Sequence, residues 1–368
     1  MKRLMVFPFL LLFVFLLAAC GDSVPLNASQ SGSNIPSTIQ SQAKTTPTIM
    51  RNGTFREYAL PLPNSGLMRP AIDHKGRIWF GEMGHNLLAV FDPHTQQFQQ
   101  IPPPAGRSGI MGVVVATDDT IWFAEQYANY IGHYFPATGN FQTYPLPMLT
   151  VPDPGVPGKM LTLPSAPNDL VLDGQGNVWF TELNANALGK LNIQNGHIQQ
   201  YPLAVSKMTQ ALNPYGITVD PQGNIWFTEA STNHIGRLDP KTGKISYVSI
   251  QRLPTSLMEI ASDARGTIWA TSFSSGLLLS YNPKTSNFTR YYAPSNGGMY
   301  GITITPDGQV WVTLSAGNAI AHLDPVANRF TEYVIPSRAS LPLGIAMDAN
   351  NALWFTEAGS DKIGVLNP

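Results

Sequence analysis

Three charged residues occupy one register position in a repeated phrase of this 368-residue chain. The position lies ten residues before a tryptophan, and four of its seven occurrences are glycine. The other three are Arg69, Asp169 and Glu259, one cation and two carboxylates. Such a set could bind a polar or cationic ligand, or hold a divalent metal ion such as magnesium or calcium. Alternatively, one carboxylate pairs with Arg69 and the other faces water.

The preceding position, eleven residues before each tryptophan, is largely apolar, with methionine at three occurrences and tyrosine at two. Thioether and aromatic side chains adapt well to apolar surfaces. If these residues face one opening, they predict a cup that binds an apolar or cyclic small molecule, or a protein partner. The seven residues of this ring are Met68, Met111, Asn168, Tyr215, Met258, Tyr300 and Leu343.

One histidine, His85, stands in a predicted loop on the same face as this cup. Imidazole titrates near neutral pH, so His85 is a candidate for proton transfer, and Glu259 is a second one. His85 and the nearby Glu82 do not form a catalytic constellation by themselves, because their spacing implies no nucleophile or third partner. A lone exposed histidine is more often incidental.

Five glutamates and five asparagines recur in register. A ring of carboxylates suggests a metal site, for which Asp169, Glu259 and Glu357 are the candidate ligands. A repeated residue more often serves each unit alike, so we expect the glutamates to accept backbone N–H groups and the asparagines to cap a turn. The two sets are Glu82, Glu125, Glu182, Glu229 and Glu357, and Asn86, Asn129, Asn186, Asn233 and Asn318.

The elements that position these residues are seven repeated units of about 40 to 45 residues. The best-preserved unit, residues 214–247, has four short apolar runs separated by turns of the Asp-Pro-x-Gly type, and no helical period. Three residues before each tryptophan stands Gly, Asp or Asn, which tolerate the left-handed backbone of a tight hairpin. The tryptophans are Trp79, Trp122, Trp179, Trp226, Trp269, Trp311 and Trp354.

Seven four-stranded units predict an all-β, seven-bladed β-propeller over residues 54–368. The last unit lacks a fourth strand, whereas residues 54–61 form a strand that precedes the first unit. We expect the N-terminal strand to complete the last blade and thereby close the ring. The loops before the first strand of each blade, and those after the second strand, then share one face, which we call the top face.

The gap between Trp122 and Trp179 holds about fourteen extra residues, mainly 145–167. This proline-rich insertion precedes a first strand, so it lies on the top face beside Asn168 and Asp169. Proline stiffens such a loop. It is either one wall of a binding site or a neutral surface insertion.

The composition narrows the choice of partner. Only 12% of the residues are charged, the formal net charge is −1, and there is no basic stripe. Nucleic acid is therefore excluded as a partner on electrostatic grounds.

The N-terminus resembles a bacterial lipoprotein signal. Lys2 and Arg3 precede an apolar stretch that ends in Leu-Ala-Ala-Cys20-Gly, and Cys20 is the single cysteine of the chain. We expect a signal peptide at 1–19, and a lipidated Cys20 that opens a flexible Ser-, Thr- and Gln-rich linker over 20–53. The protein would then sit at the cell membrane by this lipid alone, facing the extracytoplasmic side.

The phrases Trp-Phe-Thr-Glu, Asn-x-Ile-Gly-(Arg/Lys)-Leu and Pro-Tyr-Gly-Ile resemble the streptogramin lyases, the virginiamycin B lyase family, over about residues 54–368. The resemblance implies a propeller that opens a cyclic depsipeptide by elimination with the help of magnesium. It also implies a proton-transferring histidine in a Pro-His-Gly-Ile turn. In this chain, the histidine position of that turn corresponds to the ring eleven residues before each tryptophan. This ring contains no histidine, and its residue in the last blade is Leu343. Leucine can neither transfer a proton nor bind a metal, so the mechanism is not carried over.

Two classes of function remain. The first is an extracytoplasmic propeller that binds a ligand or partner at the top-face funnel without this chemistry. The second is a metal-dependent carbon–oxygen lyase, or a lactone hydrolase, that uses the same funnel. The missing histidine favours the first class.

Overall fold

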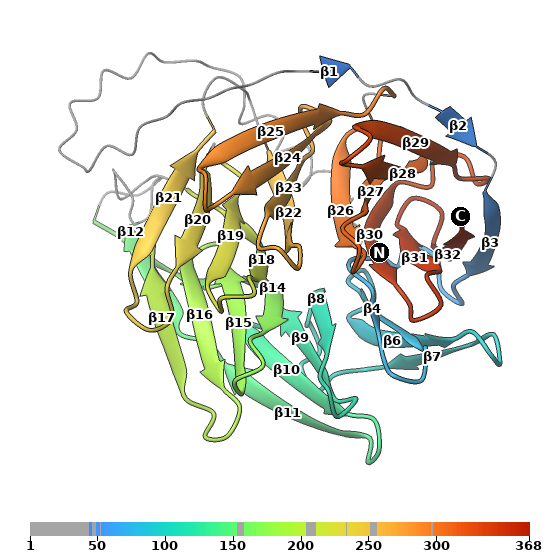
Figure 1. Cartoon of the computed structure of the whole chain (residues 1–368). Helices are drawn as coiled ribbons and strands as arrows, with labels where there is room; N and C mark the ends of the chain where they lie inside the picture. Colours follow the sequence, from blue (N-terminus) through green and yellow to red (C-terminus); the bar gives the residue numbers. More distant parts are fainter. Residues whose placement is uncertain are drawn as a thin grey trace.

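The protein is a closed ring of β-sheets arranged around a central axis (Figure 1). The computed structural model describes residues 44–45, 49–51, 53–152, 158–203, 211–232, 234–250, 256–295 and 297–368. Regular secondary structure in these ranges is entirely β-strand, and seven four-stranded antiparallel blades form the ring. The predicted all-β, seven-bladed propeller is confirmed. None of the described residues lies in a helix that is long and apolar enough to cross a membrane.

Each blade is a meander whose first strand is innermost. Blade 1 contains β4 (Ala71–Ile72), β5 (Ile78–Glu82), β6 (Leu87–Asp92) and β7 (Gln97–Ile101). Blade 2 contains β8 (Ile110–Val115), β9 (Ile121–Glu125), β10 (Tyr130–Phe135) and β11 (Asn140–Pro145). Blade 3 contains β14 (Pro167–Leu172), β15 (Asn177–Glu182), β16 (Ala187–Asn192) and β17 (Ile198–Pro202). Blade 4 contains β18 (Pro214–Val219), β19 (Ile225–Glu229), β20 (His234–Leu238) and β21 (Ile245–Ser249).

The other three blades repeat this order, and the last one closes the ring. Blade 5 contains β22 (Leu257–Ser262), β23 (Ile268–Ser272), β24 (Leu277–Asn282) and β25 (Asn287–Tyr292). Blade 6 contains β26 (Met299–Ile304), β27 (Val310–Leu314), β28 (Ala319–Asp324) and β29 (Arg329–Val334). Blade 7 contains β30 (Pro342–Met347), β31 (Leu353–Glu357), β32 (Lys362–Asn367) and, from the N-terminal side of the chain, β3 (Thr54–Ala59), which pairs antiparallel with β32. The predicted closure by residues 54–61 is confirmed.

The tryptophans pack between blades and also fix the hairpins beneath them. All seven are at most 6% exposed, and Trp226, for example, packs against Ile268 and Leu277 of blade 5. Its indole N–H donates to Asp220 at 2.8 Å, and the other oxygen of Asp220 accepts backbone N–H groups in the hairpin turn. Four other blades have the same Trp–Asp hydrogen bond. In blade 4, one aspartate thus stabilises the hairpin turn and also holds the buried tryptophan in place.

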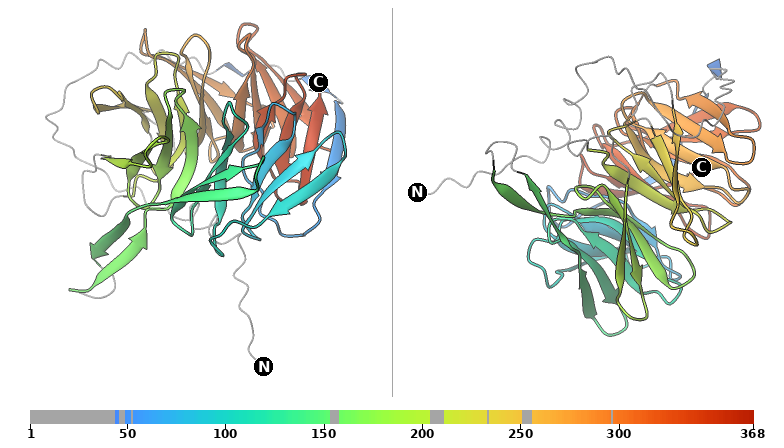
Figure 2. Two further views of the ribbon diagram at one scale, coloured as in Figure 1. Left: turned by 90° about the horizontal axis from the view of Figure 1, so that it is seen from below. Right: turned by 90° about the vertical axis from the view of Figure 1, so that its left-hand side faces the viewer.

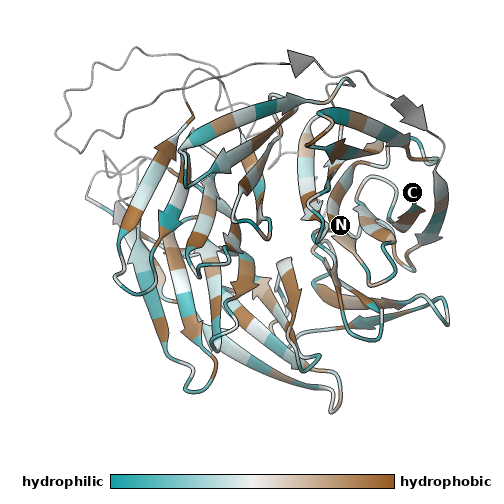
Figure 3. Cartoon of the chain, viewed as in Figure 1, coloured by the Kyte–Doolittle hydropathy of each residue, from teal (hydrophilic) through white to brown (hydrophobic). Residues whose placement is uncertain are grey.

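The hairpin tips have the predicted conformation. All seven residues that stand three positions before a tryptophan have a positive φ, from 61° at Asp119 to 91° at Gly308. Figure 3 shows hydrophobic bands along the strands of the blades and more hydrophilic colours at many of the turns. The alternation agrees with sheets whose faces pack against neighbouring blades.

Two additions lie outside the seven blades. The insertion after blade 2 forms a hairpin of β12 (Met148–Pro152) and β13 (Met160–Pro164), which projects from the ring (Figure 2). Within the segment expected to be a linker, β1 (Lys44–Thr45) pairs parallel with β25, and β2 (Ile49–Arg51) pairs parallel with β29. Part of that segment is therefore attached to the outer edges of blades 5 and 6.

Candidate functional site

A β-bulge in the innermost strand places the two predicted rings at the axis. In blade 4, Pro214 pairs with Glu229 and Ile217 with Phe227, so that Tyr215 and Gly216 face a single residue of β19. The same register shift occurs in the first strand of blades 2 to 7. Bulges re-aim side chains and are common beside functional sites. Here the bulged pair is the residue of the apolar ring followed by the residue of the glycine and charged ring.

The apolar ring is brought together, but it is closed by its own side chains. Six of its seven residues, together with Met83 and Ala230, form one hydrophobic cluster, and each of the six is at most 7% exposed. Asn168 is fully buried beside it, where its amide donates to the carbonyl oxygen of Tyr215 at 3.0 Å. The six residues are Met68, Met111, Tyr215, Met258, Tyr300 and Leu343. The predicted cup is therefore a packed plug in this conformation.

The three charged residues meet beneath this plug. Arg69 Nε donates to Glu259 Oε2 at 2.7 Å and lies 3.6 Å from Asp169 Oδ1, while Arg69 Nη2 contacts Glu259 Oε1. The guanidinium carbon lies 5.3 Å from the ring centre of Tyr215, whose hydroxyl is 2.6 Å from that of Tyr300. Blades 1, 3, 4, 5 and 6 thus contribute to one polar cluster on the axis.

Burial dominates the electrostatics of this cluster. It raises the pKa of Glu259 to about 7, even though Arg69 favours the charged form. The pKa of Asp169 is also raised by burial, which outweighs the effects of Arg69 and of the backbone N–H groups of Leu170 and Ile217. Burial disfavours the charge of Arg69 as well, but the two carboxylates more than compensate and hold its pKa well above the usual value.

The magnesium ion that the family resemblance implies does not fit these residues. Arg69 already lies between Asp169 and Glu259, and Asp169 accepts two backbone N–H groups. The third candidate ligand, Glu357, belongs to another constellation, because its carboxylate accepts a hydrogen bond from Ser360 at 2.8 Å. Over the described part of the chain, no three His, Cys, Asp or Glu side chains are grouped to hold a metal. An internal cation occupies the place between the carboxylates.

One nitrogen atom of this cluster has no acceptor. Within the described residues, Arg69 Nη1 is buried and has no hydrogen-bond partner. A buried guanidinium N–H without an acceptor is costly, and native proteins rarely leave one so. Arg69 Nη1 therefore retains two N–H groups at the axis, from which an external oxygen atom could accept a hydrogen bond.

His85 does not join the axial cluster. Its Nε2 lies 2.8 Å from the carbonyl oxygen of Pro63 in the adjoining top-face loop, and it interacts electrostatically with Glu82. No contact links His85 with Glu259 among the described residues. The two proton-transfer candidates therefore belong to separate environments.

The repeated glutamates are buried, but their hydrogen-bond donors differ from those we predicted. Side chains rather than backbone N–H groups satisfy them: Gln100 donates to Glu82 at 2.8 Å, and Gln200 donates to Glu182 at 2.5 Å. Thr232 and Ser360 do the same for Glu229 and Glu357. Glu125 is the exception in this set, because neither of its oxygens has a partner among the described residues, and burial raises its pKa to about 7.

The repeated asparagines cap turns as expected and also connect blades. Four of them have positive φ, and their side-chain oxygens accept N–H groups from the loop that leads into the next blade, as Asn129 does from Ala166 at 3.1 Å. The four are Asn86, Asn129, Asn186 and Asn318. Asn233 lies outside the described residues, as does Cys20.

A threonine relay between blades was missed by sequence reasoning. Thr228 lies opposite the bulge of its own blade, accepts the N–H of Gly216 at 2.9 Å, and donates to the carbonyl oxygen of Met258 in blade 5 at 2.5 Å. The same pair of bonds recurs in three other blades, at Thr181, Thr271 and Thr313. The repeated Trp-Phe-Thr-Glu phrase contained the signal, but its threonine reads as an ordinary strand residue.

Known proteins share this architecture over almost their full length. The crystal structure of selenomethionine-substituted virginiamycin B lyase from Staphylococcus aureus has a TM-score of 0.74 and 25% identity, and the match covers 86% of this chain and 99% of that one. A streptogramin B lyase structure gives 0.75 and 27%, covering 86% and 98%. A third structure, a catalytically inactive variant of the Staphylococcus aureus enzyme with one histidine replaced by alanine, contains quinupristin and gives 0.72 and 25%, covering 86% and 100%.

The sequence also matches a family model. The model of the virginiamycin B lyase family matches residues 37–278 and 166–368, which together include all seven blades. No curated protein sequence matches the chain significantly. On the family match and the shared architecture, the chain belongs to the virginiamycin B lyase family.

Proposed function

We propose that this protein binds a ligand or partner at the top-face end of its axis and does not carry out the histidine-dependent elimination of its family. The observation that supports this most directly is the axial constellation. Arg69, Asp169 and Glu259 form an internal ion cluster under an apolar plug, and neither the charged ring nor the apolar ring contains a histidine. The arrangement has the features of a recognition site and lacks an obvious base.

The relatives support the absence of chemistry. Replacing a single histidine by alanine gives the catalytically inactive virginiamycin B lyase that was crystallised with quinupristin. In this chain the ring position eleven before the last tryptophan is Leu343, where the family resemblance implies histidine. A propeller that keeps the scaffold and lacks this group resembles that inactive variant.

The plug and the free donor suggest how a ligand would be held. Methionine side chains repack easily, so Met68, Met111 and Met258 can move aside and then cover an apolar ligand. The unpaired Nη1 of Arg69 would donate to a carbonyl or ester oxygen of that ligand. A compact ligand with apolar side chains and exposed carbonyl groups, such as a cyclic depsipeptide, meets both requirements.

Membership of the lyase family favours a second candidate, a carbon–oxygen lyase or lactone hydrolase at the same place. Such an enzyme would need a base other than the missing histidine. Glu259, with its pKa raised to about 7 by burial, is the candidate, although Arg69 is bound to it. His85 would have to act from a separate loop.

Calorimetry with quinupristin as the probe, in the presence of magnesium, tests the proposal. We expect saturable heat and recovery of the intact depsipeptide. Elimination yields a linear isomer of unchanged mass with a new alkene and carboxylic acid, whereas hydrolysis adds one water. The recovered probe must therefore be compared by chromatographic retention as well as by mass.

A matched pair of variants locates the site. Met111→Arg introduces a long charged side chain into the plug and should abolish binding, whereas Met111→Leu keeps its apolar character and should bind as the native chain does. Linear product from the native chain would establish the enzymatic alternative. Binding that survives Met111→Arg would place the ligand elsewhere.

We further propose that the mature chain is held at the extracytoplasmic side of the cell membrane by lipid on Cys20. The lipoprotein-like signal around this single cysteine supports the proposal. Detergent phase partitioning of the native protein and of Cys20→Ser tests it. We expect the native protein in the detergent phase and the variant in the aqueous phase; a native protein in the aqueous phase would contradict lipidation.

A further inference from the structure

Each tryptophan begins a row of side chains on one face of its blade. Residues that pair directly across antiparallel strands point to the same side of the sheet. In blade 4, Trp226 on β19 pairs with Arg237 on β20, which pairs with Ser246 on β21. The second residue of the row is therefore the side chain that lies next to the indole on that face of the sheet. In chain order the seven second residues are Val90, His133, Lys190, Arg237, Ser280, His322 and Val365.

Four of the seven rows place a cationic or imidazole side chain over the indole. His133 stacks on Trp122 with ring centres 3.7 Å apart, and His322 stacks on Trp311 at 4.4 Å. Lys190 Nζ lies 5.3 Å from the ring of Trp179, and the guanidinium carbon of Arg237 lies 5.9 Å from that of Trp226. At the second position of the row, a flat or positively charged group is therefore the commonest neighbour of the tryptophan.

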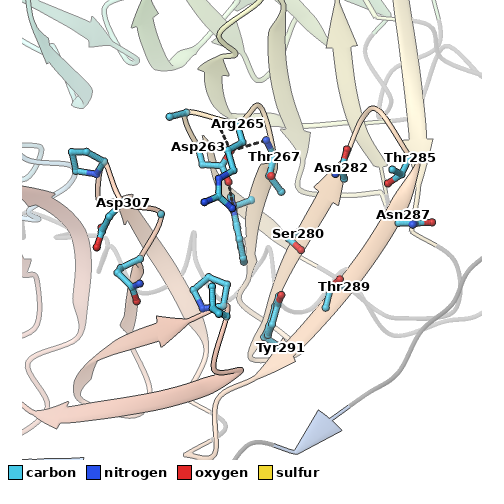
Figure 4. A pocket seen from close by; sticks show the side chains of 17 residues that line it. Asp263, Arg265, Thr267, Ser280, Asn282, Thr285, Asn287, Thr289, Tyr291 and Asp307 are labelled. Atoms are coloured by element: carbon cyan, nitrogen blue, oxygen red, sulfur yellow. Dashed lines mark hydrogen bonds between the residues drawn. The ribbon is translucent and has the colours of Figure 1, made fainter.

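Blade 5 has no such group at the second position of its row, although Tyr291 of β25 stacks on Trp269 with ring centres 5.6 Å apart. Its row reads Trp269, Ser280 and Thr289, so two small hydroxyl residues follow the tryptophan. A cavity of about 600 Å³ opens at this place, and Trp269, Ser280 and Thr289 all line it. The cavity lies at the ends of blades 5 and 6 opposite the top face, and none of the axial residues lines it. Figure 4 shows the side chains that do.

Blade 4 shows what fills such a cavity. The cavity beside Trp226 is smaller, about 430 Å³, and Arg237 is one of its lining residues. Arg237 Nη2 donates to Asn224 at 2.7 Å, which holds the guanidinium near the indole. At the second position of the row, blade 4 therefore has a cation, Arg237, where blade 5 has Ser280, and the blade 5 cavity is the larger of the two.

The charged residues around the blade 5 cavity are complementary to a cation. Two aspartates and one arginine line it, so the lining has one excess negative charge. The oxygens of Asp263 accept the N–H groups of Arg265, Thr267 and Trp269. Asp307 comes from blade 6 and lies opposite Thr289 in Figure 4. Its exposed carboxylate accepts the hydroxyl of Thr305, and this bond lowers its pKa, so it is charged at neutral pH.

We propose that this cavity is a second binding site, which accepts a guanidinium or ammonium group of a ligand against Trp269. The ligand supplies the cation that Arg237 supplies in blade 4, and Asp307 is its counter-ion. The hydroxyls of Ser280 and Thr289, which also interact with the hydroxyl of Tyr291, donate to or accept from the rest of the ligand. This site is independent of the axial cluster and of whatever binds there.

Indole N–H resonances of the full-length protein provide the test, with acetyl-arginine amide as the probe and its neutral isostere acetyl-citrulline amide as the control. The seven tryptophans give seven indole signals, and Trp269→Phe assigns one of them. We expect the arginine probe to shift the Trp269 signal saturably and to leave the axial region unaffected. The citrulline probe should bind at least about fivefold more weakly, because it lacks the charge.

Matched substitutions make use of the comparison with blade 4. Ser280→Arg should fill the cavity internally and abolish the shift, whereas Ser280→Ala should retain it. Asp307→Asn should weaken binding about three- to fivefold, since an exposed charge contributes modestly. Arg237→Ser should open the equivalent space in blade 4, so that the arginine probe then also shifts the Trp226 signal. The remaining indole signals report whether each variant is folded.

Three results would overturn the proposal. The first is no saturable shift of the Trp269 signal at millimolar arginine probe. The second is equal binding of the citrulline probe, which would indicate a site for neutral polar ligands. The third is a shift that persists in folded Ser280→Arg, which would place the probe outside this cavity.

Discussion

The axial cluster and the blade 5 cavity differ in both chemistry and access. The axis contains the methionine, tyrosine and charged residues that stand out in the sequence. However, the ten predicted site residues there are at most 9% exposed. Around Trp269 and Tyr291, the cavity of about 600 Å³ is lined largely by serine, threonine, asparagine and aspartate, which are typical of any turn. Distinctive residues thus coincide with close packing, and common residues with open space. A binding site needs both a chemical group and room for a ligand, and each region makes one of them evident.

The largest expected effect concerns the buried charges of the axis. Arg69→Leu leaves Asp169 and Glu259 without their cation, and we expect the free energy of unfolding at pH 8 to fall by about 3–5 kcal/mol. Denaturant unfolding measures this. The triple variant Arg69→Leu, Asp169→Asn, Glu259→Gln should recover most of the loss. A single variant as stable as the native chain would show that water reaches the axis freely.

Glu125 should make the free energy of unfolding depend on pH. Its pKa is raised by burial to about 7, so the folded state binds the proton more tightly than the unfolded state does. The protein should therefore lose stability as the pH rises from about 4.5 to about 7, and stay at the lower value above that range. Glu125→Gln should be more stable than the native chain by about 2 kcal/mol at pH 8, and equally stable at pH 4.

Glu82→Gln is the control, because Gln100 donates to both oxygens of Glu82 and partly compensates its burial. Unfolding curves across this pH range should show a smaller difference for Glu82→Gln. An equal pH dependence for both variants would mean that the unpaired state of Glu125 is not the cause.

The threonine relay should have an intermediate effect. Thr228→Val keeps the shape but leaves the N–H of Gly216 and the carbonyl oxygen of Met258 without partners, and we expect a loss of about 1–3 kcal/mol. Thermal or chemical unfolding measures it. The equivalent residues in blades 1 and 2 are Gly81 and Ala124, which have no hydroxyl. Ala124→Thr therefore makes the opposite change, because it adds a hydroxyl at this position. A neutral Thr228→Val would show that water replaces the hydroxyl.

The smallest effect belongs to the open cavity. Ser280→Arg should change the free energy of unfolding by no more than about 0.5 kcal/mol, because the new side chain extends into the open cavity. Met111→Arg introduces the same side chain at the axis, and we expect it to lower the free energy of unfolding several times more. Similar losses at the two sites would contradict the contrast between a packed axis and an open cavity.

Much of the fold was predictable because it rests on local, repeated signals. The seven tryptophans, the left-handed hairpin tips and the closing strand at Thr54–Ala59 each follow from residue type and spacing. The insertion at 145–167 was located correctly, but its β12–β13 hairpin was not foreseen, since a two-stranded ribbon leaves a weak pattern. The pairing of β1 and β2 with outer strands depends on edges formed by residues far away in the sequence.

The donors to the repeated glutamates were predicted incorrectly for a similar reason. Gln100 and Glu82 lie on different strands, 18 residues apart, and their meeting depends on blade register. A repeated acceptor is visible in a sequence, whereas its donor varies among glutamine, threonine and serine from blade to blade. Only the assembled sheet shows that Glu125 has none among the described residues.

The sequence alone determined the number of blades, the place of every hairpin tip and the two rings that reach the axis. These features repeat, and each depends on backbone preferences and periodic burial within one unit. The tertiary structure decided that Arg69 meets Glu259 from a strand 190 residues away, that the methionines close over them, and that Ser280 leaves a cavity open. Those outcomes depend on how side-chain volumes from separate blades fill a shared space, which no single unit encodes.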